Sequence, residues 1–241
     1  MLEVRDLCKR FGGVRAVDEV SWSIAAGETR CIIGPNGAGK STFFQLLVGR
    51  LRPDAGSIAF DGLNITRRHP FKRARLGIAV KPQTLGVFGD LTVEHNLRLC
   101  LQRTVSEPDC TYRIEETLHA LGLAQKSAFL TKELSHGEKQ WLGLGMAMAI
   151  SPRLLLLDEP TAGMSPAETE RTVDMIRTVA AGGTSVLAIE HDMAFVRSLA
   201  ATTTVFHNGR VFVTGTIAEI ESNAEVQRLY LGQRGAARLR H

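Results

Sequence analysis

The chain has 241 residues, a formal net charge of +4 and an apolar fraction of 44%. These values resemble those of soluble globular proteins, and they exclude a largely disordered chain, a low-complexity repeat and a fold that depends on disulfides. The longest apolar runs, such as LLLL at residues 154–157, are far shorter than the roughly eighteen residues that span a bilayer. We therefore expect no membrane helix and no signal peptide, and we expect the chain to stay in the cytosol.

The cysteines and the basic stretches give little functional information by themselves. The four cysteines are Cys8, Cys31, Cys100 and Cys110. They lack CxxC spacing, so we interpret them as reduced, packed thiols and predict no metal cluster. The most basic stretches are RRHPFKRAR at residues 67–75 and QRGAARLRH at residues 233–241. We interpret both as solvated surface, with a nucleic-acid or lipid contact as the alternative.

The first elements in chain order lead into a glycine-rich loop. The alternating sequence VSWSI at residues 20–24 predicts a half-exposed strand, and CII at residues 31–33 predicts a short buried strand. A helix is predicted from Lys40 to Gly49, followed by a turn and a strand around residues 58–60. The order is therefore strand, glycine loop and helix.

Helical spacing dominates between residues 84 and 149. Ile114, Leu118 and Leu121 recur at intervals of four and three residues, and Gly122 ends the run. We interpret this part of the chain as a helical insertion.

Strands and helices alternate again after the insertion. Buried strands are predicted at residues 154–157 and 185–189, and a helix with one apolar face is predicted over residues 173–179. This alternation is typical of a mostly parallel sheet flanked by helices. Asn208 and Gly209 predict a hairpin, and Thr216 begins a capping box that predicts one of the last helices.

The sequence GPNGAGKST at residues 34–42 predicts a phosphate loop. It consists of Gly34, Pro35, Asn36, Gly37, Ala38, Gly39, Lys40, Ser41 and Thr42. The glycines let backbone N–H groups converge on phosphate oxygens at the start of a helix. Lys40 adds a positive charge for the β and γ phosphates, and Ser41 offers a hydroxyl to Mg²⁺. We therefore predict ATP and Mg²⁺ as cofactors.

Two carboxylates follow the LLLL run. Asp158 and Glu159 stand at the carboxyl end of a predicted buried strand, which lies beside the phosphate loop in such folds. Asp158 is predicted to hold the metal through water, and Glu159 to orient or deprotonate the attacking water. The alternative for either residue alone is a helix N-cap.

A second serine-and-glycine element, LSHGEKQ at residues 134–140, precedes an apolar helix. The order of the phosphate loop, KPQ with Gln83, LSHGE, LLLLDEP and IEHD with His191 resembles the ATP-binding subunits of ABC transporters over nearly the whole chain. This resemblance implies a head-to-tail dimer with two ATP molecules at its interface. In each site the signature residues of one chain meet the γ-phosphate held by the other; the signature residues are Ser135, His136, Gly137 and Glu138.

The same resemblance assigns roles to three more residues. Phe11 is expected to stack on adenine, although a lone Phe at a strand end is equally often a core residue. Gln83 is expected to touch Mg²⁺ and the attacking water, and His191 to contact the γ-phosphate as the switch histidine. Without the other motifs, His191 would be interpreted as a capped surface residue.

The chain departs from the commonest family pattern at two sites. His136 and Glu138 replace glycine and glutamine of LSGGQ, and Ser165 stands where the loop TAGMSP usually carries aspartate. Neither change removes a catalytic carboxylate, so the resemblance implies an active ATPase.

The resemblance also implies a fold and its division. It predicts an α/β P-loop NTPase (RecA-like) core with a mostly parallel sheet, an antiparallel β subdomain and an inserted helical subdomain. A single ATP-binding domain is expected over residues 1–241, with its core at about 1–83 and 150–241 and the helical signature subdomain at about 84–149.

The arrangement of motifs favours a separate subunit of an importer. Only 95 residues separate Lys40 from Ser135 and no heptad run lies between them, which excludes the coiled-coil ATPases of chromosome maintenance. The expected partners are a second ATPase subunit, identical or different, transmembrane permease subunits and, indirectly, a periplasmic solute-binding protein; no nucleic acid is expected. The permeases would hold the chain at the cytoplasmic face of the inner membrane, through TLGVFGDLTVEHN at residues 84–96. The alternative for this stretch is an ordinary loop and helix start.

The sequences LSHGEKQWL, LLLLDEPTAGMSP and IEHDMAFV resemble those of ATPase subunits from the branched-chain amino acid and urea uptake group. They resemble the urea-type ATPase subunit most. Urea or a short amide is therefore the predicted solute. A branched-chain amino acid is the alternative, and a soluble regulatory or DNA-associated ATPase is the alternative from another class.

Overall fold

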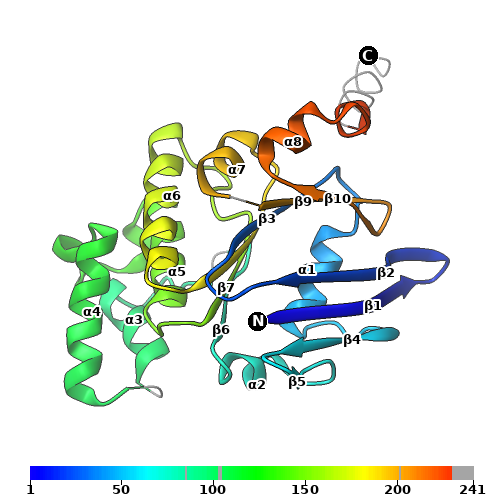
Figure 1. Cartoon of the computed structure of the whole chain (residues 1–241). Coiled ribbons are helices and arrows are strands. Elements are labelled where there is room, and N and C mark those ends of the chain that lie inside the picture. The colour runs from blue at the N-terminus through cyan, green and yellow to red at the C-terminus, as the bar shows by residue number, and fades with distance from the viewer. Residues whose placement is uncertain (85, 103–104, 201, 230–241) are drawn as a thin grey trace. The chain divides into compact units, whose positions relative to one another are not determined.

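The computed structural model describes residues 1–84, 86–102, 105–200 and 202–229 (Figure 1). The chain divides into two compact units, which are Met1–Arg73 with Ile189–His241 (unit 1) and Ala74–Ala188 (unit 2). The basic stretch at residues 233–241 lies outside the described residues. Within the described ranges, no helix has the length and hydropathy needed to cross a bilayer.

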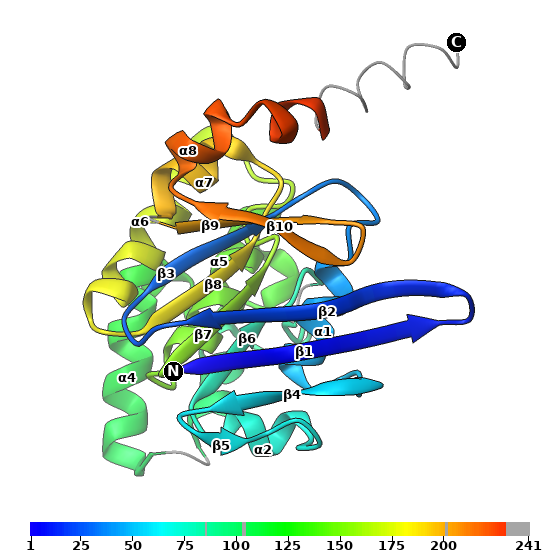
Figure 2. The same ribbon diagram turned by 45° about the vertical axis from the view of Figure 1, so that its right-hand side comes forward.

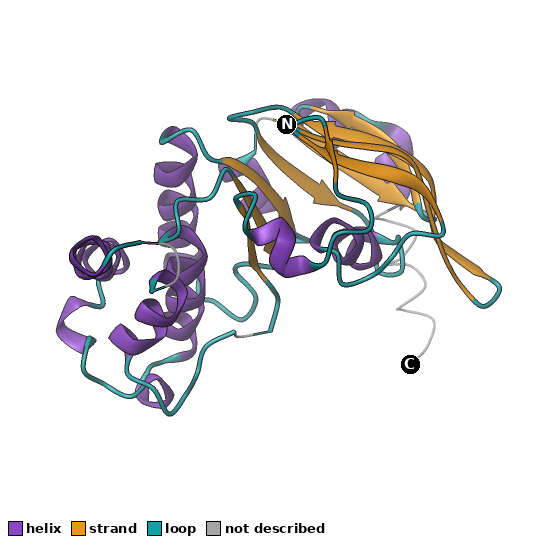
Figure 3. Ribbon diagram, turned by 90° about the horizontal axis from the view of Figure 1, so that it is seen from below, coloured by secondary structure: helices purple, strands orange, loops and turns teal. Residues whose placement is uncertain are grey.

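Unit 1 contains an antiparallel sheet and a smaller group of strands. Its strands are β1 (Leu2–Phe11), β2 (Val14–Ile24), β3 (Thr29–Ile33), β4 (Ala55–Phe60), β5 (Leu63–Asn64), β9 (Thr202–His207) and β10 (Arg210–Gly215). The antiparallel sheet has the order β2-β1-β4-β5, and these strands lie side by side in Figures 2 and 3. Strand β3 pairs in parallel with β9, and β9 pairs antiparallel with β10.

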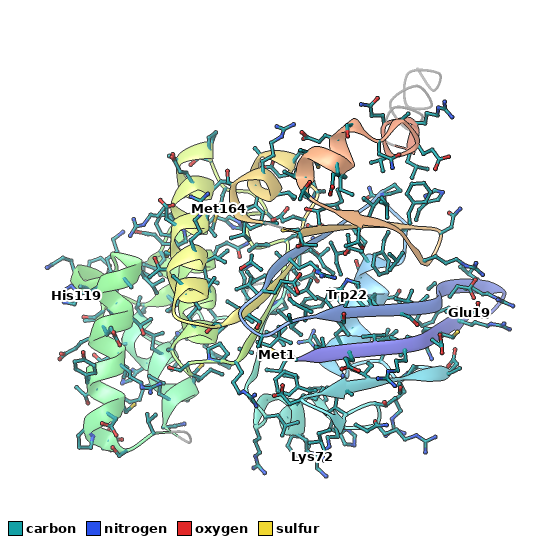
Figure 4. All side chains as sticks on the ribbon, in the orientation of Figure 1. Met1, Glu19, Trp22, Lys72, His119 and Met164 are labelled. Atoms are coloured by element: carbon teal, nitrogen blue, oxygen red, sulfur yellow. The ribbon has the colours of Figure 1, made fainter. Side chains whose placement is uncertain are left out.

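The helices of unit 1 are α1 (Lys40–Val48), α7 (Met193–Leu199) and α8 (Ile217–Ser222), and α2 (Pro70–Ala74) lies at its boundary. The apolar side of β2 packs toward α1, because Trp22 meets the ring of Phe43 edge-on with 5.7 Å between centroids (Figure 4). The Trp22 indole N–H also donates to Thr204 Oγ1 of β9 at 3.2 Å. Alternating apolar residues of β2 therefore fix the sheet against the helix that follows the phosphate loop.

A buried arginine closes the other end of α1. The Arg73 side chain is 1% exposed, and its guanidinium donates to the carbonyls of Leu46 and Leu47 at 2.8 and 2.6 Å. It also donates to the carbonyls of Thr66 and Arg68. A cation at the C-terminus of a helix complements the helix dipole. Burial lowers the pKa of Arg73 to about 10, so the guanidinium keeps its charge at neutral pH.

We expect Arg73→Leu to lower the free energy of unfolding by about 3 kcal/mol, because it removes the guanidinium hydrogen bonds to four backbone carbonyls. Urea unfolding followed by circular dichroism measures this loss. The matched control is Lys72→Leu, since Lys72 is exposed on the same helix (Figure 4). Equal unfolding midpoints for the two variants would show that the Arg73 contacts do not stabilise the fold.

Unit 2 combines parallel strands with the longest helices of the described chain. Its strands are β6 (Ile78–Lys81), β7 (Leu154–Asp158) and β8 (Ser185–Ile189), whose last residue belongs to unit 1. Its helices are α3 (Val93–Leu101), α4 (Glu107–Leu121), α5 (His136–Met148) and α6 (Pro166–Ala181), with the short 3-10 helices η1 (Ala124–Lys126) and η2 (Thr131–Glu133). Strand β7 lies between β8 and β6, and β6 and β7 run parallel.

Several sequence predictions are confirmed by these elements. Helix α1 ends at Gly49, and α4 ends at Gly122, each with the left-handed backbone that glycine tolerates at a helix end. Asn208 and Gly209 have φ values of 49° and 78°, which suits the tight turn between β9 and β10. Thr216 caps α8 with the expected capping box. The subdomain boundaries at residues 84 and 149 stay a prediction.

Candidate functional site

The phosphate loop follows β3 directly. Residues 31–33 of β3 are fully buried, and the loop comes to the surface at Asn36 and Gly37 before α1 begins at Lys40. No acidic residue lies in the first turn of α1, and no side chain caps its N-terminus. The first N–H groups of this helix therefore suit an external anion.

Two glycines of the loop are required by close backbone contacts. A Cβ on Gly34, whose φ is 150°, would lie 2.3 Å from the carbonyl oxygen of Phe206. A Cβ on Gly39, whose φ is 100°, would lie 2.2 Å from the carbonyl oxygen of Ala16. Any side chain at either position would push the loop away from its neighbouring strands.

The Lys40 side chain turns back across the loop. Its Nζ donates to the carbonyls of Gly34 and Pro35 at 2.6 and 3.0 Å. The ammonium group is thus held inside the curve of the loop, where converging backbone N–H groups and a positive charge fit a polyphosphate. Ser41, at the second position of α1, is exposed and its hydroxyl suits a hard cation such as Mg²⁺.

Two further predicted site residues belong to unit 1. Phe11 ends β1 with 48% of its surface exposed, and the ammonium of Lys9 lies 5.6 Å from its ring centroid. The exposure of Phe11 argues against a core role and leaves its face available for stacking. His191 follows buried Glu190, whose backbone N–H donates to the carbonyl of Ile32 at the end of β3. This bond ties the His191 segment to the strand that leads into the phosphate loop.

The two predicted site carboxylates, Asp158 and Glu159, lie in unit 2, and the strand register explains the neighbour of Glu159. Strands β6 and β7 are parallel with Lys81 opposite Leu157, so Gln83 and Glu159 each stand two residues beyond a paired position. They meet, because Gln83 Nε2 donates to Glu159 Oε2 at 2.7 Å. Asp158 is buried as the last residue of β7. The structure therefore joins two of the three predicted catalytic residues through a parallel pair of strands.

Ser135 begins α5 as its N-cap. Its Oγ accepts from the N–H of Glu138 at 3.2 Å, and the Glu138 carboxylate accepts from the N–H of Ser135 at 2.9 Å. Lys126 adds an ion pair to Glu138 at 2.6 Å. Burial acts to raise the pKa of Glu138, but the hydrogen bonds from Lys126 and Ser135 outweigh it and hold the pKa below its usual range. Glu138 is thus an ionised capping residue.

At the two departures from the commonest family pattern, His136 and Ser165 each make a contact within the chain. The His136 ring reaches the loop after β7, with Nε2 at 3.1 Å from the carbonyl oxygen of Ala162. Ser165 caps α6, since its Oγ accepts from the N–H of Glu168, and the Glu168 carboxylate accepts from Ser165 in return. Those hydrogen bonds from Ser165 hold the pKa of Glu168 below its usual range. The spacing of residues in the sequence did not predict the contact between His136 and Ala162.

Residues 17–162 match the family of ABC transporters. The chain belongs to the ATP-binding subunits of ABC transporters. The lipopolysaccharide export system ATP-binding protein LptB of Acidithiobacillus ferridurans is 33% identical over 233 residues, which cover 96% of this chain and 97% of LptB. The high-affinity branched-chain amino acid transport ATP-binding protein LivG of Salmonella typhimurium is 30% identical over 250 residues. The match covers 97% of this chain and 98% of LivG.

A solved ABC cassette matches the fold as well. The ADP conformation of MJ1267, an ATP-binding cassette of an ABC transporter, is 28% identical with a TM-score of 0.86, and the match covers 96% of this chain and 98% of MJ1267. The predicted P-loop NTPase fold is therefore confirmed as that of an ABC ATPase cassette, and the chain is an ATPase of this family.

Proposed function

We propose that this ABC ATPase drives the import of a small polar solute, with urea or a short amide as the favoured cargo. Three segments support this proposal, because their sequences resemble those of the branched-chain amino acid and urea uptake group. They are LSHGEKQWL, LLLLDEPTAGMSP and IEHDMAFV. The match to LivG over nearly the full length of both chains supports membership of that group and favours a branched-chain amino acid as the second candidate.

In the proposed reaction the phosphate loop binds ATP. The loop N–H groups and Lys40 bind the phosphates, Phe11 stacks on the adenine, and His191 contacts the γ-phosphate. Mg²⁺, when bound, would neutralise phosphate charge, and the hydroxyl of Ser41 and the carboxylate of Asp158 are the oxygen donors that suit it. Both groups have the hard-oxygen chemistry that Mg²⁺ prefers, so the residues fit the ion.

Glu159 is the proposed general base. Its carboxylate orients and deprotonates the attacking water, and Gln83 fixes that carboxylate through the 2.7 Å hydrogen bond while it also contacts Mg²⁺ and the water. Glu159 follows a fully buried strand, which limits its movement during the reaction.

The signature residues, Ser135 to Glu138, are proposed to face the ATP of a second ATPase subunit. The start of α5 suits a phosphate, because a helix N-terminus presents N–H groups and the positive end of the dipole. Two ATP molecules would favour a closed dimer, and hydrolysis with phosphate release would open it. A different ATPase subunit is allowed as the partner, as well as a second copy of this chain.

Permease subunits are proposed to dock on the stretch at residues 84–96, of which all but Leu85 is described. Phe88 is 56% exposed there, and Phe129 of the neighbouring segment is 48% exposed. The two segments are tied by backbone hydrogen bonds, including Lys132 N–H to the carbonyl of Gly89 at 3.0 Å. Exposed aromatic side chains on a braced segment suit a partner surface. Docking would place the chain at the cytoplasmic face of the inner membrane.

The test is ATP hydrolysis by the complex reconstituted in lipid with its permeases. Binding protein preloaded with urea, a short amide or leucine is added in separate reactions. We expect urea or the amide to raise hydrolysis several-fold, because cargo delivery favours the closed dimer. Stimulation by leucine alone would assign the branched-chain cargo, and lack of stimulation by all three would refute the importer assignment.

A further inference from the structure

Two helix N-termini meet in unit 2. Helix α5 begins at the signature cap Ser135, and helix α6 begins at Ser165 with the same kind of capping box. The Glu168 carboxylate of the second box lies against Gly137, because a Cβ on Gly137 would stand 2.0 Å from Glu168 Oε1. Trp141 Nε1 donates to Thr172 Oγ1 at 3.0 Å one turn further along both helices. The signature helix and the start of α6 are therefore packed as one body.

His136 extends this contact to the loop between β7 and α6. A carbonyl oxygen only accepts hydrogen bonds, so Nε2 is the protonated nitrogen when the ring binds Ala162 at 3.1 Å. The ring also packs against Gly163, whose φ is 75°, since a Cβ there would lie 3.0 Å from Nε2. The imidazole thus fills the space beside two consecutive loop residues.

Residues 159–164, which we call the catalytic loop, connect the His136 contact at Ala162 to Glu159. The N–H of Ala162 donates to the carbonyl of Glu159 at 3.3 Å, and the N–H of Met164 donates to the carbonyl of Thr161 at 3.1 Å. Glu159 itself has a φ of 45°, a backbone conformation that is costly for a non-glycine residue. A strained residue keeps its conformation only where its surroundings hold it, and Ala162 is one hydrogen-bonded turn away.

We propose that His136 is a positioning residue, which anchors the catalytic loop to the signature helix through the Ala162 carbonyl and so holds Glu159 in its hydrolytic conformation. The proposal rests on the proposed function, in which α5 faces the partner's nucleotide and Glu159 acts on the chain's own. His136 thereby couples the two sites: contact of the signature helix with one ATP steadies the carboxylate that hydrolyses the other. A glycine at position 136, as in LSGGQ, has no side chain to make this link.

The test compares His136→Ala with His136→Gln in the full chain. Alanine removes the ring without harming the first turn of α5, whereas glutamine keeps an amide donor at similar reach. Initial rates of phosphate release give kcat and the KM for ATP, and thermal unfolding gives the melting temperature. His119→Ala is the matched control, because His119 is exposed on α4 (Figure 4).

We expect His136→Ala to lower kcat about five-fold, as the loss of one net hydrogen bond implies, with little change in KM and melting temperature. His136→Gln should recover most of the lost turnover, and His119→Ala should match the wild type. Wild-type turnover in His136→Ala, or equally low turnover in His136→Gln, would overturn the proposal. A raised KM with unchanged kcat would also overturn it, since the ring would then act on nucleotide binding and not on the position of Glu159.

A failure of the proposed function can be distinguished from a failure of the positioning role of His136. Wild-type chain and Glu159→Gln chain are assayed alongside, and their difference tests the role of Glu159 without involving His136. Equal rates in those two chains would refute the assignment of Glu159 and the positioning role that depends on it. A large difference between them together with an unaffected His136→Ala chain would refute the positioning role alone.

Discussion

The Glu159→Gln chain is expected to hydrolyse ATP about a thousand-fold more slowly than the wild type while it binds ATP with unchanged affinity. The amide has the shape of the carboxylate, but it does not accept a proton from water. Its oxygen still accepts the hydrogen bond from Gln83, which spans 2.7 Å in the wild type. We expect binding to be unaffected because the proposed contacts to ATP, from the phosphate loop, Phe11 and His191, are unchanged.

Phosphate release measures the rate of hydrolysis, and calorimetric titration measures the affinity for ATP. Glu116→Gln is a matched control, because it removes an exposed carboxylate from α4 in the same unit. Wild-type turnover in the Glu159→Gln chain would remove Glu159 from the mechanism. Loss of ATP binding would instead show that its carboxylate supports the nucleotide site itself.

The Lys40→Ala chain is expected to bind ATP about 10 to 100-fold more weakly, since hydrogen bonds to charged groups are worth more than neutral ones. Lys40 also donates to the Gly34 and Pro35 carbonyls, so its removal loosens the loop as well. Calorimetric titration with ATP measures the affinity, and Lys72→Ala, an exposed lysine of α2, is the control. Unchanged affinity in Lys40→Ala would place the polyphosphate elsewhere.

The sequence predicted the local elements of this site because each depends on neighbours in the chain. The phosphate loop follows the predicted strand β3 and leads into α1, and LLLL forms the buried strand that ends at Asp158. Gly49 and Gly122 end their helices as their backbone freedom predicts. These predictions rest on the spacing of apolar residues and on the backbone freedom of glycine, and both can be recognised in a single sequence.

Contacts between distant segments were not predictable in the same way. The pairing of Gln83 with Glu159 depends on the register of β6 against β7, which no sequence pattern specifies. Arg73 was part of a basic stretch interpreted as solvated surface, yet its guanidinium is buried against α1; this part of the interpretation was wrong. Hydrogen bonds from the guanidinium to the carbonyls of Leu46, Leu47, Thr66 and Arg68 offset the cost of burying that charge, and no local sequence pattern predicts them.

The two departures from the family pattern show the same limit. From the sequence, the consequence of Ser165 in place of aspartate was open, and the structure makes it the N-cap of α6. The Nε2 of His136 binds the carbonyl of Ala162, and the expected place of His136 among the signature residues at a phosphate stays a prediction. In both cases the side chain serves a contact within the chain, and tertiary packing decided which contact that is.

We propose that each ATP is shared by the phosphate loop of one subunit and the signature residues of another. We would mix two impaired chains, Lys40→Ala and Ser135→Asp, at an ATP concentration too low for either chain alone to hydrolyse ATP measurably. Aspartate keeps the helix cap but its charge repels a γ-phosphate. In random mixing half of the dimers are mixed and retain one intact site of two, so we expect about a quarter of wild-type hydrolysis from an equimolar mixture. A mixture as inactive as its components would contradict the shared site.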